Sequence, residues 1–98
     1  MTKAIFIGDE VTASAYRLVG LDTRIPEGSD VRRMFEAAMA ESELLVITSR
    51  AAMQLPADRL RVAIRRAEPL ILVVPDAAGS SPLEELDRRV DRVLGIEQ

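Results

Sequence analysis

The chain has 98 residues, a length that fits one small domain spanning 1–98. It contains no cysteine and no histidine, which excludes disulfides, thiolate or imidazole metal sites and a Ser-His-Asp triad. The formal net charge of −3 argues against a nucleic-acid partner. No apolar run reaches the length of a membrane span, and the first residues lack a signal-peptide pattern.

Three short apolar runs predict strands that are buried on both faces, at residues 4–7, 44–47 and 70–74. A fourth candidate, residues 23–25, is short and charged and is followed by Pro26. That composition is typical of an edge strand. The sequence therefore predicts four strands.

Helical periodicity separates these strands and extends beyond the last one. The expected buried faces, in chain order, are Val11, Ala15, Leu18 and Val19; Val31, Phe35, Ala38 and Met39; Leu60, Ala63, Ile64 and Ala67; and Leu83, Leu86, Val90, Val93 and Leu94.

The helix boundaries carry their own signals. Gly20 is expected to end the first helix and Asp30 to cap the second. Pro56 divides the third helical region into a short turn at 49–55 and a helix at 57–67. The run Ser81-Pro82-Leu83-Glu84 is a capping box that opens the last helix.

The order of elements is β-α-β-α-β-α-β-α. Right-handed crossovers then give an α/β fold: a four-stranded parallel sheet, doubly wound with helices on both faces, receiver-like or flavodoxin-like. Ligands and partners of such folds gather at the carboxyl ends of the strands. Here those ends read Gly8-Asp9-Glu10, Thr48-Ser49-Arg50 and Pro75-Asp76.

The acidic pair Asp9 and Glu10 resembles the carboxylates that hold Mg²⁺ beside the phosphoacceptor aspartate in receiver domains of response regulators. That site needs an aspartate where this chain has Thr48 and Ser49, and a lysine after a late strand, whereas the single lysine is Lys3. Asp9 and Glu10 therefore serve either the positive end of a helix dipole or a partner contact. The loop 77–81 lacks phosphate-loop spacing and is interpreted as a plain loop before the capping box. We expect no catalytic residue, no cofactor and no metal site.

One surface residue has two interpretations. On a helical projection Val62 lies opposite the apolar face, among four arginines of the same helix: Arg59, Arg61, Arg65 and Arg66. An apolar residue with a charged rim is a candidate interface anchor. Single exposed apolar residues are also ordinary in soluble proteins.

Several segments together resemble the F subunit of V-type and archaeal A-type ATP synthases. The opening Ile7-Gly8-Asp9-Glu10-Val11-Thr12 with Tyr16-Arg17-Leu18-Val19-Gly20 is similar to that family's I-G-D-E-x-T-x-x-G-F-R-L-A-G. Residues 45–48, 69–75 and 93–96 resemble its later motifs in order. The chain departs from the family pattern at Ala15-Tyr16 and at Ser49, where the family has Gly-Phe and an acid, and in the less charged linker to the last helix.

The resemblance implies a non-catalytic rotor subunit of the central stalk. Such a subunit binds the coiled-coil shaft subunit (D) of the rotor, helps couple ATP turnover to ion transport, and lies in the cytoplasm, peripheral to the membrane. Its last helix packs on the sheet or turns toward the catalytic head, and the sequence leaves both open. The expected interface residues are Asp9, Glu10, Thr12, Arg17, Ser49, Arg50, Val62 and Arg65. The alternative is a degenerate receiver-like module that regulates by binding protein.

Overall fold

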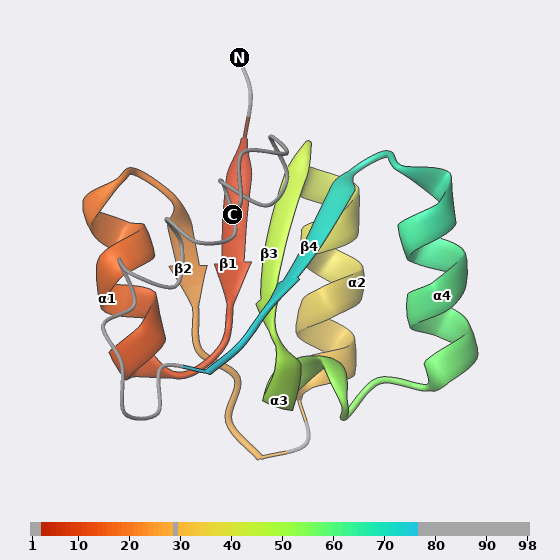
Figure 1. Cartoon of the computed structure of the whole chain (residues 1–98), viewed down its shortest axis with the longest axis horizontal. Helices are drawn as coiled ribbons and strands as arrows, with labels where there is room; N and C mark the ends of the chain where they lie inside the picture. Colours follow the sequence, from red (N-terminus) through yellow and green to blue (C-terminus); the bar gives the residue numbers. More distant parts are fainter. Residues whose placement is uncertain (1–2, 29, 77–98) are drawn as a thin grey trace, which may run out of the picture.

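The computed structural model describes residues 3–28 and 30–76, and they form a parallel α/β layer structure (Figure 1). The elements in chain order are β1 (Ala4–Ile7), α1 (Glu10–Leu18), β2 (Asp22–Arg24), α2 (Val31–Glu41), β3 (Leu44–Thr48), α3 (Ser49–Ala52), α4 (Ala57–Arg66) and β4 (Leu70–Val74). All four strands are parallel, in the order β2-β1-β3-β4. The predicted loop at 77–81 and the predicted last helix lie outside the described residues.

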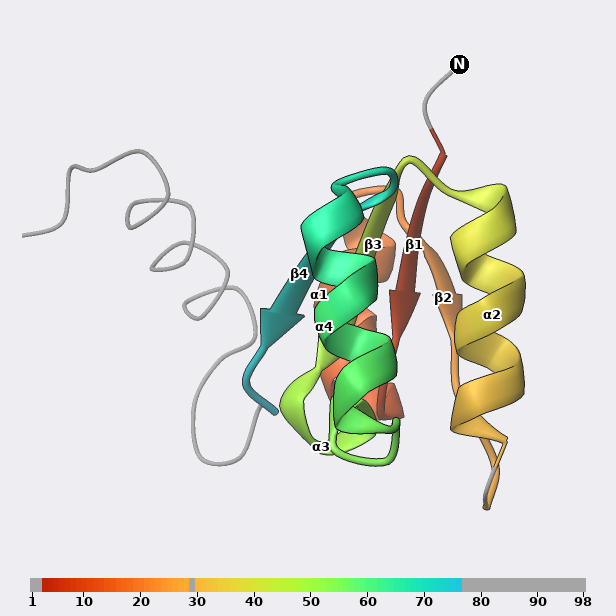
Figure 2. The same ribbon diagram turned by 90° about the vertical axis from the view of Figure 1, so that its right-hand side faces the viewer.

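The sheet has helices on both faces, as predicted. Seen from the α4 side, α4 stands in front of the sheet and α1 behind it (Figure 2). The strand register places Ile5, Leu45 and Ile71 side by side on one face, where they join the core beneath α2, α3 and α4. We call this the three-helix face. The opposite face carries Phe6 and Val46, which form a second core with α1, and we call it the α1 face.

The predicted buried face of α1 is only partly correct: Ala15 is buried as expected, but the buried side is rotated by roughly a quarter of a turn from the predicted one. Val11 and Leu18 are 66% and 81% exposed, whereas Thr12, Ala13, Ala15 and Tyr16 are buried. The reason is the aromatic pair: the Tyr16 ring stacks on Phe6 with ring centroids 4.8 Å apart. Burying an aromatic ring contributes more than burying one further aliphatic side chain, so Tyr16 sets the rotation of the helix.

The other helices follow the predictions more closely. Val31, Phe35 and Ala38 of α2 are fully buried. In α4, Ala63 is buried but Ile64 is 45% exposed, and Ala67 has left the helix with a left-handed φ of 58°. Because α4 lies over the edge strand β4, a narrow line of its residues reaches the core. The predicted face was therefore too wide.

The boundary signals mostly correspond to the observed ends. Gly20 has a φ of 101° directly after the C-cap of α1, the conformation that favours glycine there. The edge strand β2 lies one residue earlier than expected. Asp30 occupies the N-cap position of α2, but its side chain makes no capping hydrogen bond.

Candidate functional site

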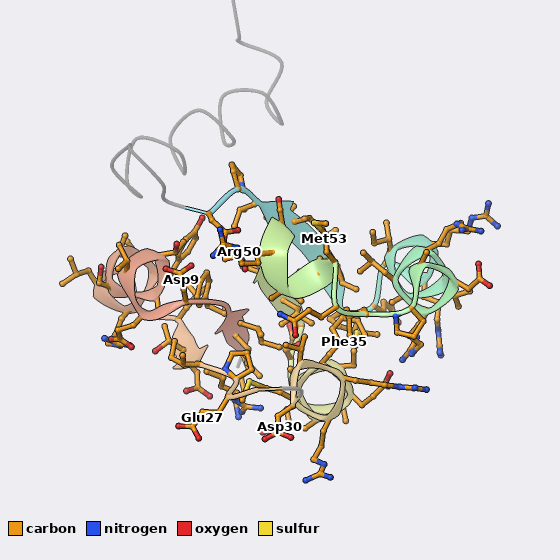
Figure 3. All side chains as sticks on the ribbon, turned by 90° about the horizontal axis from the view of Figure 1, so that it is seen from below. Asp9, Glu27, Asp30, Phe35, Arg50 and Met53 are labelled. Carbon is orange, nitrogen blue, oxygen red and sulfur yellow. The ribbon has the colours of Figure 1, made fainter. Side chains whose placement is uncertain are left out.

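The carboxyl ends of β1, β3 and β4 meet in one shallow cleft, as the fold class predicts. Seen from this end, Asp9 and Arg50 lie next to each other (Figure 3). The cleft has a volume of about 260 Å³, slightly below the range of roughly 300–1,000 Å³ in which small ligands bind. Its charged lining residues are Asp9, Glu10, Arg50 and Asp76.

Asp9 is fully engaged as the N-cap of α1. One carboxylate oxygen accepts from the backbone N–H of Thr12 at 2.9 Å, and the other accepts from its hydroxyl at 2.7 Å. Burial alone raises the pKa of Asp9, but its hydrogen bonds, chiefly the two from Thr12, together outweigh burial and leave the pKa below its usual value. Of the two interpretations of Asp9, the structure bears out its placement at a helix N-terminus.

Ser49 and Arg50 tie the start of α3 to the end of β4. The Ser49 hydroxyl donates to the Val74 carbonyl at 3.2 Å. The Arg50 backbone N–H donates to an Asp76 carboxylate oxygen at 3.1 Å, and its guanidinium Nε lies 3.5 Å from the other. The Arg50 side chain is 81% exposed and the Asp76 side chain 19% exposed. Asp76 therefore organises the turn, while the arginine points toward solvent.

Glu10 and Arg17 form an ion pair on the outside of α1. Two guanidinium nitrogens donate to the two carboxylate oxygens at 2.8 and 3.2 Å, and Nε donates to the Thr23 hydroxyl at 3.0 Å. The hydrogen bond from Arg17 lowers the pKa of Glu10 and raises that of the guanidinium. The pair links the first turn of α1 to its last turn and to β2, a connection that the sequence did not reveal. Its signal was the spacing of seven residues, which places both side chains on one helix face.

Three polar side chains that line the cleft make hydrogen bonds to the backbone around it. Asp9 caps a helix, Asp76 holds a turn, and the Thr48 hydroxyl accepts from the Ala51 N–H as the N-cap of α3. Within residues 3–28 and 30–76 no group of three or more acidic side chains is arranged to hold a metal ion.

The expected interface residues fall on separate surfaces. Asp9, Glu10, Ser49 and Arg50 lie at the carboxyl end of the sheet, and Arg17 continues along α1 from Glu10. Thr12 belongs to the same helix but is 2% exposed. Val62 and Arg65 lie on α4, which packs against the edge strand β4 and is remote from α1 (Figure 1).

An exposed apolar ridge on α1 was not expected from the sequence. Val11 and Leu18 lie on one side of the helix, beside the Glu10–Arg17 pair. Between them, the Ser14 hydroxyl folds back to donate to the Val11 carbonyl at 2.7 Å. We call Val11, Ser14 and Leu18 the α1 ridge. The periodicity of these residues correctly indicated an apolar side of the helix. The structure shows that this side faces away from the sheet.

None of the helices that the structure describes is both long and apolar enough to cross a membrane. A search of curated proteins returned no match. The family model described as ATP synthase (F/14-kDa) subunit matches residues 4–93. That match covers nearly the whole chain, including all four strands, and agrees with the motifs at the start of α1. The chain therefore belongs to the ATP synthase (F/14-kDa) subunit family, the F subunits of the V/A-type rotary ATPases.

Proposed function

We propose that this chain is a non-catalytic subunit of the central stalk, which binds the coiled-coil shaft subunit and helps couple ATP turnover to ion transport. Its place would then be in the cytoplasm, peripheral to the membrane. The family match supports the role of an ATPase subunit. The use of the cleft carboxylates in helix capping and turn formation supports a role in binding rather than in chemistry.

The observation that carries the binding proposal is the α1 ridge. Val11 is 66% exposed and Leu18 81% exposed, and both belong to the helix that carries the family-like motif. A coiled coil presents long apolar and charged rows, which suit a narrow apolar ridge with an ion pair beside it. In this proposal Leu18 and Val11 provide the buried contact, while Glu10 and Arg17 fix the register.

The other residues expected at the interface have different parts in the proposal. Ser49 and Arg50 extend the contact at the carboxyl end of the sheet, next to the start of α1. Thr12 is buried, so it acts by holding Asp9 and the helix start in place rather than by touching the shaft. Val62 and Arg65 form a second, separate surface, available to another subunit of the complex. The catalytic head remains the expected partner of the C-terminal residues.

The experiment is co-expression with the coiled-coil shaft subunit from the same genome, followed by size-exclusion chromatography and titration calorimetry. We expect a stable one-to-one complex. If the two folded chains do not associate, the central-stalk proposal is wrong.

Two matched variants then locate the contact. Leu18→Asp on the α1 ridge should weaken binding roughly tenfold or more, as expected for a central apolar contact. Val62→Asp, at a 52% exposed site on α4, should bind as the parent does. The reverse result would move the contact to α4 and leave the central-stalk role standing.

A further inference from the structure

The helix α4 is strongly basic, although the chain as a whole is acidic. It carries four arginines and one aspartate, whereas the net charge of the chain is −3. One of these arginines has a clear part in the fold. Arg59 forms an ion pair with Glu36 of α2 at 2.6 Å, and its guanidinium lies over the Phe35 ring, 5.6 Å from the ring centroid. Arg59 therefore holds α4 against α2.

The other three arginines are not explained by contacts within the fold. Arg61 pairs with Asp58 at 3.2 Å, but the two side chains are 60% and 90% exposed, and such pairs contribute little to stability. Arg65 and Arg66 are exposed and form no ion pair within the described part of the chain. A cation in the last helical turn complements the helix dipole. However, Arg61 and Arg65 are four residues apart, where like charges destabilise a helix.

These three arginines share one side of α4 with an apolar residue. On a helical projection Arg61, Arg65, Val62 and Arg66 follow one another over about 140°. Ala63, which is fully buried in the core, lies on the other side of the helix. Val62 is 52% exposed and lies between Arg65 and Arg66. We call Arg61, Val62, Arg65 and Arg66 the basic face of α4.

The basic face of α4 is remote from the α1 ridge. The helix α4 packs on the edge strand β4, whereas α1 packs on β1 and on the opposite edge strand β2 (Figure 1). Several side chains of α4 extend outward from the molecule (Figure 3). A partner that binds the α1 ridge therefore does not need to touch the basic face.

The composition of the basic face favours a protein partner that carries carboxylates. Guanidinium groups bind carboxylates through paired hydrogen bonds, and Val62 supplies an apolar contact with charges at its rim. The acidic net charge of the chain disfavours a nucleic acid. A helix that lies on a membrane buries its apolar side in lipid, whereas the apolar side of α4 packs on the protein's own core.

We propose that the basic face of α4 binds an acidic segment of a subunit other than the shaft subunit. Val62 contacts an apolar side chain of that segment, and the three arginines pair with its carboxylates. The inference rests on the proposed function in one respect, because it places the partner among the subunits of the ATPase complex. The α1 ridge then takes the shaft subunit, while the basic face takes a second partner of opposite charge.

Site-specific cross-linking tests this proposal, and the absence of cysteine from the chain makes it selective. Val62→Cys is labelled with a benzophenone maleimide and then assembled with the other ATPase subunits from the same genome. After illumination, mass spectrometry identifies the cross-linked peptides. We expect cross-links to one acidic segment outside the shaft subunit. Ser14→Cys on the α1 ridge is the matched control and should cross-link to the shaft subunit instead.

The outcomes distinguish this proposal from the proposed function. If Ser14→Cys cross-links to the shaft subunit but Val62→Cys gives no cross-link to protein, the basic face has no partner and the central-stalk role stands. Cross-links from Val62→Cys to lipid, to the shaft subunit or to a segment without an excess of carboxylates would also overturn the inference. If neither folded variant joins the complex, both proposals are wrong.

Charge reversal tests the part of the arginines. Arg65→Glu, combined with Val62→Cys, should lower the cross-link yield roughly fivefold or more, because like charges then face each other. Arg33→Glu changes the net charge equally at an exposed position of α2 and should leave the yield nearly unchanged. Circular dichroism verifies that both variants are folded. Equal losses in the two variants would show that the net charge, and not the basic face, controls binding, which contradicts the proposal.

Discussion

Replacing Asp9 by alanine separates the structural role of this carboxylate from any role in binding. The side chain accepts two hydrogen bonds from Thr12, one from the backbone at 2.9 Å and one from the hydroxyl at 2.7 Å. Loss of an N-cap side chain costs about 0.5–2 kcal/mol. The Thr12 side chain is 2% exposed, so water replaces the lost acceptor poorly, and that can add about 1 kcal/mol.

We therefore expect Asp9→Ala to lower the free energy of unfolding by about 1–3 kcal/mol. For a domain of this size each kcal/mol corresponds to a Tm decrease of about 4–8 °C. Thermal and urea unfolding, followed by circular dichroism, measure the effect. Asp9→Asn is the matched control, because an asparagine oxygen also caps a helix well, and it should lose less than half as much.

The pH dependence provides an independent check. The folded pKa of Asp9 lies below its usual value because its hydrogen bonds outweigh burial. A lowered pKa stabilises the folded state above the unfolded value of about 3.9, and that contribution is lost as the pH falls through the folded pKa. Unfolding of the parent should therefore become more sensitive to acid below about pH 4 than unfolding of Asp9→Asn. A parent and an Asp9→Ala variant of equal stability at neutral pH would refute the capping argument.

Four further variants test the packing and the surface ion pairs. Ile7→Ala removes a fully buried side chain from the three-helix face and should cost about 2–5 kcal/mol in urea unfolding; a loss below about 1 kcal/mol would mean that the core closes around the gap. Gly8→Ala places a Cβ 2.7 Å from the Phe6 ring and against the Thr48 methyl, so it should destabilise by about 1–3 kcal/mol, and an unchanged Tm would show that these neighbours yield easily. Arg17→Ala removes an exposed ion pair with Glu10 and should leave the Tm nearly unchanged, because exposed ion pairs contribute little to stability. The same variant should weaken the complex with the shaft subunit. Unaltered affinity in calorimetry would exclude Arg17 from the interface. Glu41→Gln removes the partner of Arg24 and Lys3, whose hydrogen bonds lower the pKa of Glu41 from 4.5 to about 2. Any difference in Tm from the parent should persist from about pH 7 to about pH 5, shrink as the pH falls from there toward 2, and shrink in high salt. A difference that depends on neither pH nor salt would contradict the ion-pair assignment.

The sequence by itself determined the strands and the class of fold. Runs such as 44–47 and 70–74 are wholly apolar, short and rich in branched residues, and this combination is typical of strands that are covered on both faces. Proline and glycine fixed several boundaries, because Pro56 ends a turn and Gly20 adopts a positive φ. The acidic opening of α1 and the family resemblance were also readable from local residues, without knowledge of the packing.

The tertiary structure decided which side of each helix is buried. The apolar spacing of Val11 and Leu18 predicted a core face, but Tyr16 stacking on Phe6 turned α1 so that this stripe points outward. Periodicity states that a face is apolar but not what will cover it. Similarly, the pairing of Glu10 with Arg17 depends on the rotation of a helix, and the exposure of Leu70 depends on the place of β4 at the edge of the sheet. Helix rotation and strand order depend on which side chains pack best together in one core. The residues within a single helix or strand do not determine that outcome.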